Sequence, residues 1–95
     1  MQTITTTIKR QFLSAIVVGT KTVEYREIKP YWERRLESVT VPFRLRLING
    51  MIADAPEVTV EISRVVRNGR KREFELHIAR IVNVKHWNRR RQEPE

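Results

Sequence analysis

The segment from Gly19 to Arg26, with the sequence GTKTVEYR, holds the residues of this chain that are best suited to chemistry. Its charged residues Lys21, Glu24 and Arg26 are spaced at i, i+3 and i+5. In a strand, Glu24 and Arg26 point the same way because side chains alternate, and Lys21 can reach over them from a preceding turn. Such a cluster can bind an anion or hold a lysine beside a carboxylate for proton transfer. The alternative is an exposed strand face with ordinary ion pairs, each worth about 0–1 kcal/mol.

The hydrophobic pattern predicts the elements that position this segment. A β-branched run predicts a first strand over residues 3–8, and alternating residues predict a second strand over residues 22–26. Between them the period changes to that of a helix over residues 9–18, and Gly19 follows where a helix end favours a left-handed residue. A short second helix is expected to begin at Pro30 and to run to Leu36. The first helix is predicted from one apolar face, made by Phe12, Leu13, Ile16 and Val17.

The rest of the chain alternates apolar and polar residues in three further strands, over residues 43–47, 58–63 and 74–82. The last two flank Asn68-Gly69, a strong hairpin signal. Long strands with short turns and one main helix predict an α+β fold, built on a small β-barrel of about five or six strands. We expect one domain over residues 1–87, followed by a basic polar tail over residues 88–95 that is frayed.

The four residues Gly19, Lys21, Glu24 and Arg26 match the pattern G-x-K-x-x-E-x-R. With its strand–helix–motif–strand context, this segment resembles the ASCH domain of the PUA-like superfamily. The continuation EIKPYW up to Trp32 is similar to small stand-alone members of that family, including phage-encoded ones. The resemblance implies a PUA-like β-barrel with a cleft beside the main helix, lined by the motif.

The same resemblance implies two kinds of activity. PUA-like domains mostly bind RNA or modified bases, and ASCH domains have been proposed as RNA-binding modules. Some members resemble ribonucleases, and one branch is an amidohydrolase that deacylates N4-acetylcytidine with a Lys, a Thr and a Glu. Lys21 matches that lysine, whereas Glu24 stands where that branch has threonine. Glu61 and Glu75 are the candidates for the remaining glutamate only because they lie on strands.

Charge is the strongest signal in the composition. Nineteen Lys and Arg against eleven Asp and Glu give a net charge of +8, and fourteen of the basic residues are arginines. Arginine forks onto phosphate and stacks on bases, so this excess favours a nucleic-acid partner. Tyr31 and Trp32 beside Lys29 would suit a stacking platform for bases. The alternative is that both rings pack against the barrel.

Two more basic clusters lie outside the motif. Arg67 and Arg70 flank the predicted hairpin turn within a run of five basic residues over 64–72, where they would contact a phosphate backbone or serve solubility alone. The other cluster, over residues 85–91, would add sequence-independent affinity, with Trp87 anchoring the chain end or stacking on a base.

Several classes of function are not supported. The chain has no cysteine, which excludes disulfides, Cys-ligated zinc and a thiol nucleophile, and fits a cytoplasmic protein. No apolar run approaches the roughly 20 residues of a membrane-spanning helix, and we expect no metal and no cofactor. The sequence therefore predicts binding of RNA or another single-stranded nucleic acid by Lys21, Glu24 and Arg26. The alternatives are a hydrolase acting on RNA or a modified nucleoside, with Lys21 and Glu24 as the proton-transfer pair, and a protein-interaction module.

Overall fold

The computed structural model describes residues 1–95, and the order of its elements follows from the alternating and helical segments of the sequence. All the predicted strands and both predicted helices form. The elements are β1 (Thr3–Thr7), α1 (Arg10–Val18), β2 (Val23–Glu27), α2 (Pro30–Glu37), β3 (Phe43–Ile48), β4 (Glu57–Asn68), β5 (Glu73–Lys85), β6 (Trp87–Asn88) and β7 (Glu93–Pro94).

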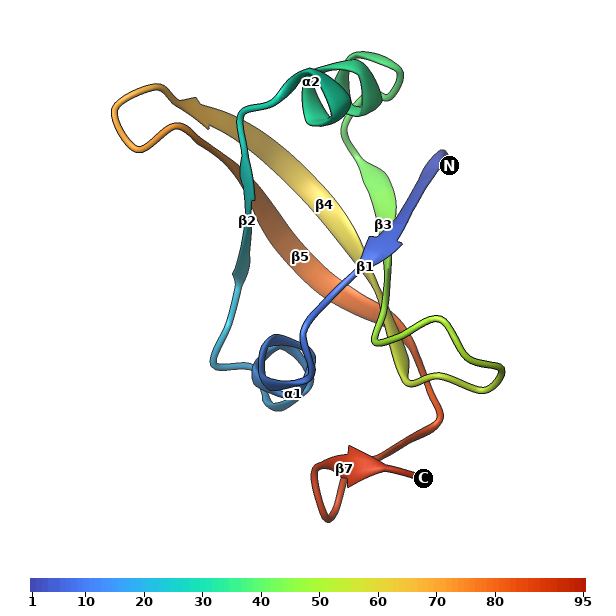
Figure 1. Cartoon of the computed structure of the whole chain (residues 1–95). Coiled ribbons are helices and arrows are strands. Elements are labelled where there is room, and N and C mark those ends of the chain that lie inside the picture. Colours follow the sequence, from blue (N-terminus) through green and yellow to red (C-terminus); the bar gives the residue numbers. More distant parts are fainter.

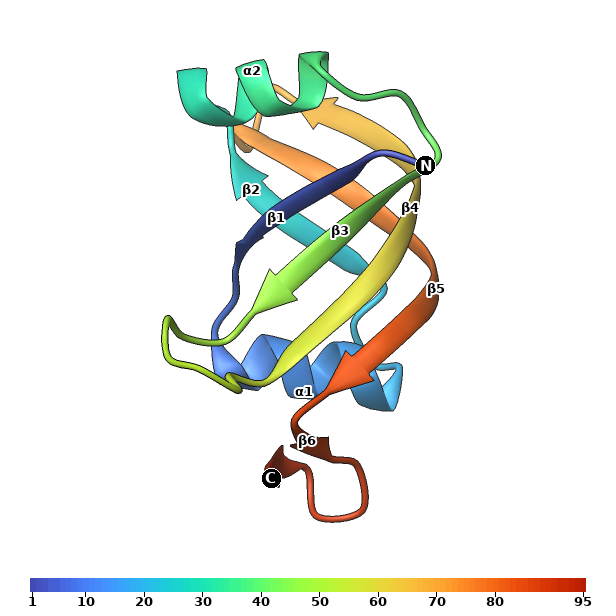
Figure 2. The same cartoon turned by 90° about the vertical axis from the view of Figure 1, so that its right-hand side faces the viewer.

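Five strands form one curled sheet in the order β1-β3-β4-β5-β2. β1 pairs with β3 in parallel, and the other neighbours are antiparallel. The long β4–β5 hairpin has register shifts between residues 59 and 64, and such irregularities bend a strand and increase its twist. The bent hairpin curls the sheet into a half-barrel, so that β1 and β2, its two edges, face each other (Figures 1 and 2). The α+β barrel-like class expected from the sequence is confirmed.

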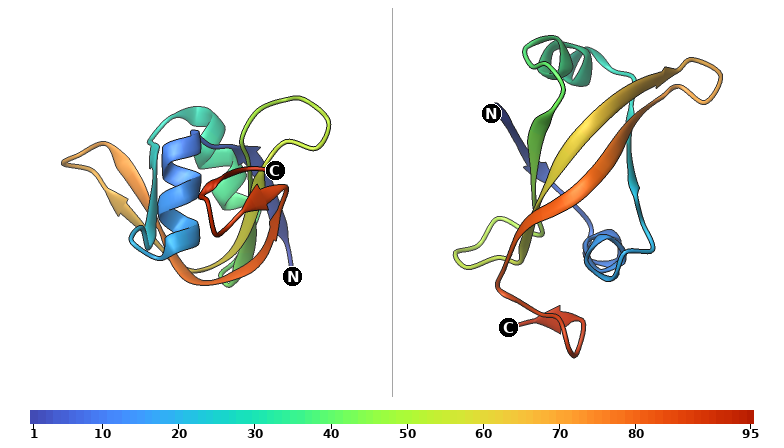
Figure 3. Two further views of the ribbon diagram at one scale, coloured as in Figure 1. Left: turned by 90° about the horizontal axis from the view of Figure 1, so that it is seen from below. Right: turned by 180° about the vertical axis from the view of Figure 1, so that it is seen from behind.

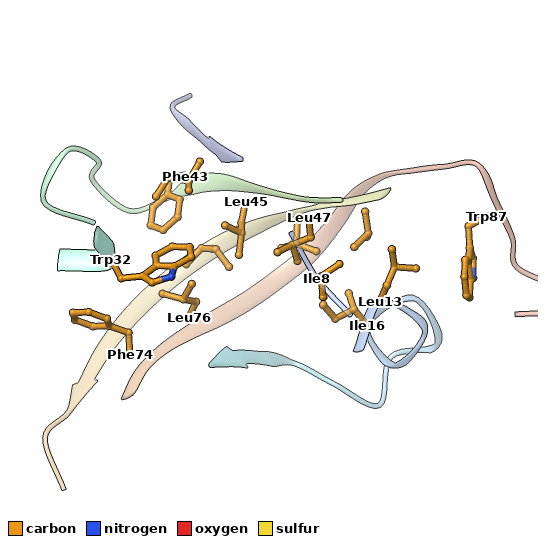
Figure 4. Packing of buried hydrophobic residues seen from close by; sticks show 14 residues of the cluster. Ile8, Leu13, Ile16, Trp32, Phe43, Leu45, Leu47, Phe74, Leu76 and Trp87 are labelled. Atoms are coloured by element: carbon orange, nitrogen blue, oxygen red, sulfur yellow. The ribbon is translucent and has the colours of Figure 1, made fainter. Parts of the chain in front are cut away.

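The core fills the concave side of this sheet. Alternate residues point inward from each strand, as in Phe43, Leu45 and Leu47 of β3, all essentially buried. Leu13 and Ile16 of α1 close one end of the half-barrel, and Trp32 of α2 closes the other (Figure 4). Because the two helices sit at opposite ends, β2 spans the distance between them as one side of the barrel (Figure 1).

Gly19 ends α1 and fixes the turn that leads into β2. It adopts φ 91°, a left-handed conformation that favours glycine, and its N–H donates to the carbonyls of Ala15 and Ile16. The N–H groups of Thr20 and Lys21 both donate to the Ala15 carbonyl, at 3.0 and 3.1 Å. Backbone hydrogen bonds therefore hold Lys21 against the end of α1, independently of the contacts that its side chain makes.

The open edge of β1 is covered by arginine side chains and not by a strand. Arg26 Nη2 of β2 donates to the Thr7 carbonyl at 2.7 Å, and Arg35 Nη2 of α2 reaches the Thr5 carbonyl at 3.5 Å. Unpaired edge groups otherwise invite pairing with another chain. Arg26 is thus the direct hydrogen-bonded link between β2 and β1, the two sides of the half-barrel.

The prediction of a frayed tail over residues 88–95 was wrong. These residues form a small ribbon, in which β6 pairs with β7 next to α1 (Figure 1). Trp87 is 4% exposed, and its Nε1–H donates to Gln92 Oε1 at 3.1 Å. The same oxygen accepts from the Ser14 hydroxyl at 3.3 Å, which ties the ribbon to α1. The polar composition of residues 88–95 gives no sign of this ordered ribbon, because its anchor is a single buried indole, that of Trp87.

None of the helices is long and apolar enough to cross a membrane.

An ion pair on the outer face of the sheet joins β3 to β4. Arg46 Nε and Nη2 donate to the two carboxylate oxygens of Glu57, at 2.7 and 2.8 Å. These hydrogen bonds lower the pKa of Glu57 from its ordinary value. Partial burial opposes this effect, whereas the positive charges of Arg46, Lys85 and His86 add to it. A fork-shaped guanidinium facing a poorly exposed carboxylate is a strong form of this interaction.

This pair predicts a loss of stability in acid. Because the folded pKa of Glu57 lies below the unfolded value of about 4.3, the pair stabilises the fold fully above that pH. The contribution is lost as the pH falls through the lower folded pKa. We expect Glu57→Gln to show a smaller drop in urea midpoint than the parent between about pH 7 and pH 3. Glu37→Gln removes an exposed carboxylate without an ion pair and serves as the control. A Glu57→Gln midpoint that falls as far as the parent's would contradict the prediction.

Candidate functional site

The structure brings Lys21, Glu24 and Arg26 together, as the spacing predicts. Glu24 and Arg26 lie on the inward face of β2, and Lys21 reaches over them from the turn after α1. Lys21 Nζ lies 3.2 Å from Glu24 Oε1, and Arg26 Nη2 lies 2.5 Å from Glu24 Oε2. The Glu24 side chain is 5% exposed, against 15% for Lys21 and 18% for Arg26. The cluster is therefore not an exposed strand face with ordinary ion pairs.

Each oxygen of the buried Glu24 carboxylate lies against a cation. Arg26 donates to Oε2 from Nη2 and also from Nε, at 3.1 Å, while Lys21 is further fixed by a 2.6 Å bond from Nζ to the Val23 carbonyl. A buried carboxylate is costly unless cations and hydrogen bonds surround it in this way. The three groups leave a net charge of +1. They also leave Arg26 Nη1 and one Lys21 proton without a partner in the protein.

Aromatic rings surround the two cations. Lys21 Nζ lies 5.2 Å from the centroid of the Phe12 ring and 5.1 Å from that of Tyr25, distances typical of cation–π contacts. The Arg26 guanidinium lies 5.3 Å from the ring centroid of Trp32. Phe12 is 41% exposed and Tyr25 is 47% exposed, so both rings offer a face to a ligand.

A groove of about 670 Å³ opens at this cluster. It runs along β2, from the start of α1 at one end to the start of α2 at the other. It combines four cationic side chains with two carboxylates, of which Glu27 is paired with Lys29 at 2.9 Å near the rim. Its lining residues are Thr7, Ile8, Lys9, Phe12, Lys21, Glu24, Tyr25, Arg26, Glu27, Lys29 and Trp32. A groove of this size with net positive charge can hold an anionic ligand as large as a nucleotide.

The structure places the two residues of the expected stacking platform, Tyr31 and Trp32, in different surroundings. Trp32 lines the groove but is only 8% exposed, with its ring against the core and against Arg26. Tyr31 is 49% exposed, makes an edge-on contact with Trp32, and lies outside the groove lining. The exposed rings at the site are instead Phe12 and Tyr25. Phe12 belongs to the apolar face predicted for the first helix, but its ring lines the groove, whereas Leu13 and Ile16 of the same face are buried in the core.

The other predicted site residues do not line the groove. Arg67 and Arg70 are exposed on the β4–β5 hairpin, where Arg67 Nη2 lies 3.8 Å from Glu33 Oε1. Neither candidate for the remaining glutamate of the amidohydrolase set, Glu61 or Glu75, lines the groove. Glu61 pairs with Arg80 across the sheet, and Glu75 lies against His77 and accepts from Asn68. The described residues hold no group of three or more potential metal ligands.

An exposed apolar loop tip, which was not evident from the sequence, lies outside the groove. Met51 and Ile52, in the loop between β3 and β4, are 96% and 78% exposed. Ile52 borders a smaller hollow of about 310 Å³, which also contains Arg46, Glu57, Lys85 and His86. The charges of that hollow are largely paired within it. Two exposed residues make a small patch by the standards of protein interfaces.

We expect Arg26 to be the stabilising member of the cluster. Arg26→Ala removes the link from β2 to the Thr7 carbonyl and leaves the buried Glu24 with Lys21 alone, so we expect a loss of about 2 kcal/mol in the free energy of unfolding. Arg35→Ala, which removes the long contact to Thr5 and a 5.9 Å contact with the Tyr31 ring but no buried ion pair, serves as the control, with an expected loss of about 0.5 kcal/mol or less. Urea unfolding followed by tryptophan fluorescence gives both values. Equal losses in the two variants would contradict this assignment.

Comparison with known proteins adds no identity to this geometry. No family model matches the chain, and no curated protein or solved structure matches it. The resemblance to the ASCH domain therefore stays a prediction from the four matching residues of the motif. The functional assignment of the site depends on the positions and charges of its own side chains.

Proposed function

We propose that this protein binds RNA or another single-stranded nucleic acid in the groove along β2. The observation that supports this best is the groove itself, which combines unneutralised cationic donors with two exposed aromatic rings. Single-stranded nucleic acids are commonly bound by a basic groove that follows the backbone and by rings on which bases stack. A double helix offers no exposed base faces to such rings.

Arg26 and Lys21 are the proposed phosphate ligands. Arg26 Nη1 and one proton of Lys21 have no partner in the protein, and both groups are held in place by Glu24. Lys9 and Lys29 extend the positive charge to the two ends of the groove. Lys9 also precedes α1, whose first turn has no side-chain cap, and free N–H groups at a helix start favour an anion. Preorganised donors of this kind lose little freedom on binding.

Phe12 and Tyr25 are the proposed base-stacking residues. Both rings are partly exposed and lie within 5.2 Å of the Lys21 ammonium, so a base stacked on one of them would lie beside that ammonium group. Glu24 has a different role in this proposal. Its Oε2 accepts from Arg26, and its Oε1 lies 3.2 Å from the Lys21 ammonium, so we assign it to orienting Lys21 and Arg26 and not to reading a base amine.

The half-barrel and the motif-lined groove also support an assignment to the ASCH domain of the PUA-like superfamily. The strand–helix–motif–strand order gives Lys21, Glu24 and Arg26 the shared groove that this family would require. Where the amidohydrolase branch has threonine, this chain has Glu24, buried between two cations.

A hydrolase is the second candidate, favoured by the 3.2 Å contact between Lys21 Nζ and Glu24 Oε1. That pair is suitably placed for proton transfer, with RNA or an N4-acylated cytidine as the substrate. Against it, Arg26 donates to the other oxygen of Glu24 from both Nε and Nη2, so the carboxylate is already engaged with a second cation. Turnover by purified protein that is lost in both Lys21→Ala and Glu24→Gln would favour the hydrolase over the binding module.

Binding of single-stranded RNA is expected to depend steeply on salt. If about six phosphates are contacted, log K should fall against log salt with a slope of about −4. Titrating a fluorescently labelled RNA at several salt concentrations measures this slope. Lys21→Ala, which removes one groove cation and no core volume, should make the slope shallower by about 0.7. Absence of binding at low salt, near 50 mM, would rule out a nucleic acid as the main partner.

Tyr25 and Tyr31 form a matched pair for testing the stacking role, because their exposed fractions are 47% and 49%. Only Tyr25 lines the groove. Tyr25→Ala should weaken RNA binding about tenfold or more, the usual contribution of one stacked base. Tyr31→Ala should leave the affinity nearly unchanged. If Tyr31→Ala were the damaging variant, the platform expected from the sequence would be right and the groove assignment wrong.

A further inference from the structure

One end of the groove continues directly onto the β4–β5 hairpin. The N–H of Ile28, the residue before Lys29 of the groove lining, donates to the carbonyl of Arg72 at 3.0 Å. On the same side, Arg67 of β4 lies against Glu33 of α2. The hairpin turn is therefore fixed beside the α2 end of the groove, beyond which it projects (Figure 1).

The hairpin tip has a dense and largely unneutralised positive charge. Residues 64–72 include no acidic residue, and their five basic residues are exposed. Arg70, Lys71 and Arg72 form no ion pair, whereas Arg67 has only the long contact to Glu33. The turn itself is ordered, because Asn68 accepts from the Lys71 N–H at 3.1 Å and donates to Glu75 at 3.2 Å. The tip is thus a fixed cationic surface at the mouth of the groove.

The C-terminal basic cluster has a different position. Arg89, Arg90 and Arg91 lie at the turn of the β6–β7 ribbon, which packs on the side of α1 that bears Arg10 and Ser14. Phe12, which lines the groove, lies about 200° around the helix from both. Seen from below, α1 stands between β2 and this ribbon, while the hairpin projects on the side of β2 (Figure 3). The C-terminal cluster is therefore separated from the groove by a helix.

We propose that a bound single strand leaves the groove at the α2 end and continues over the β4–β5 hairpin, whose basic residues hold its backbone. This inference rests on the proposed function of the groove. It makes the ligand a polymer with a defined path, in which the groove holds one or two nucleotides and the hairpin holds the phosphates that follow. The C-terminal cluster lies off this path.

The path predicts that hairpin charges act only on ligands long enough to reach them. A short oligonucleotide in the groove contacts the same protein groups with or without the hairpin cations. A longer one gains phosphate contacts on Arg70 and Lys71, each of which releases counterions and steepens the salt dependence by about 0.7. General attraction of a cationic protein would instead respond equally to any lost charge.

Two double variants distinguish the proposed path from general electrostatic attraction, because each removes two exposed cations that form no ion pair. Arg70→Gln/Lys71→Gln alters the hairpin, and Arg89→Gln/Arg90→Gln is the control in the ribbon. The probes are fluorescently labelled uridylate oligomers of about 3 and about 12 nucleotides, which bracket much of the range of site sizes in small nucleic-acid-binding barrels. Circular dichroism checks that both variants keep the parent fold.

For the long oligomer, we expect the hairpin variant to lose about tenfold in affinity, with a salt slope shallower by about 1.4, and the ribbon variant to lose about twofold or less. For the short oligomer, both variants should match the parent. Equal losses in the two variants on the long oligomer would overturn the path and leave the groove function standing. A hairpin effect as large on the short oligomer would also overturn it. Failure of the parent to bind either oligomer would instead refute the proposed function itself.

Discussion

The buried carboxylate of Glu24 is the constraint around which this site is organised. A carboxylate with a 5% exposed side chain must be compensated, and Lys21 and Arg26 provide that compensation from either side along the chain. Through Arg26, the same carboxylate supports the hydrogen bond to the Thr7 carbonyl that links β2 to β1. One charge therefore ties together the turn after α1, the strand β2 and the open edge of β1. Stability of the half-barrel and preorganisation of the groove depend on the same three side chains.

This arrangement makes the groove a place where positive charge is held in position. Glu24 neutralises only one of its two cations, and the remaining charge is confined between the two sides of the sheet. The two basic clusters outside the groove lie at or next to turns, so their effect depends on where those turns lie. The hairpin tip is held beside the groove by Ile28 and Arg72, whereas the ribbon at the C-terminus is held behind α1 by Gln92. Clusters of similar composition are thereby placed in different surroundings.

Where the sequence interpretation failed, a long-range contact was the reason. The polar segment after Trp87 was expected to fray, but a buried indole and Gln92 fasten it to Ser14, which is 78 residues away from Gln92. Phe12 fits the helical core pattern, yet the groove opens beside it. Glu61 and Glu75 lie on strands as expected, but neither lines the groove, and Glu75 stays outside it although it pairs in register with Tyr25 of the lining. The periodicity of apolar residues predicts which side chains share one face of a helix or strand. It does not predict which other part of the protein packs against that face.

The sequence by itself determined the order of strands and helices, the hairpin at Asn68-Gly69 and the shared face of Glu24 and Arg26. These depend on local alternation, helix-ending glycine and turn chemistry, all of which act between near neighbours. Only the tertiary structure decided that Arg26 reaches Thr7, that Phe12 and Tyr25 and not Tyr31 flank the cations, and which basic cluster adjoins the groove. Those outcomes depend on how far the bent β4–β5 hairpin curls the sheet, and this curvature arises from register shifts between paired strands that no single segment of sequence specifies.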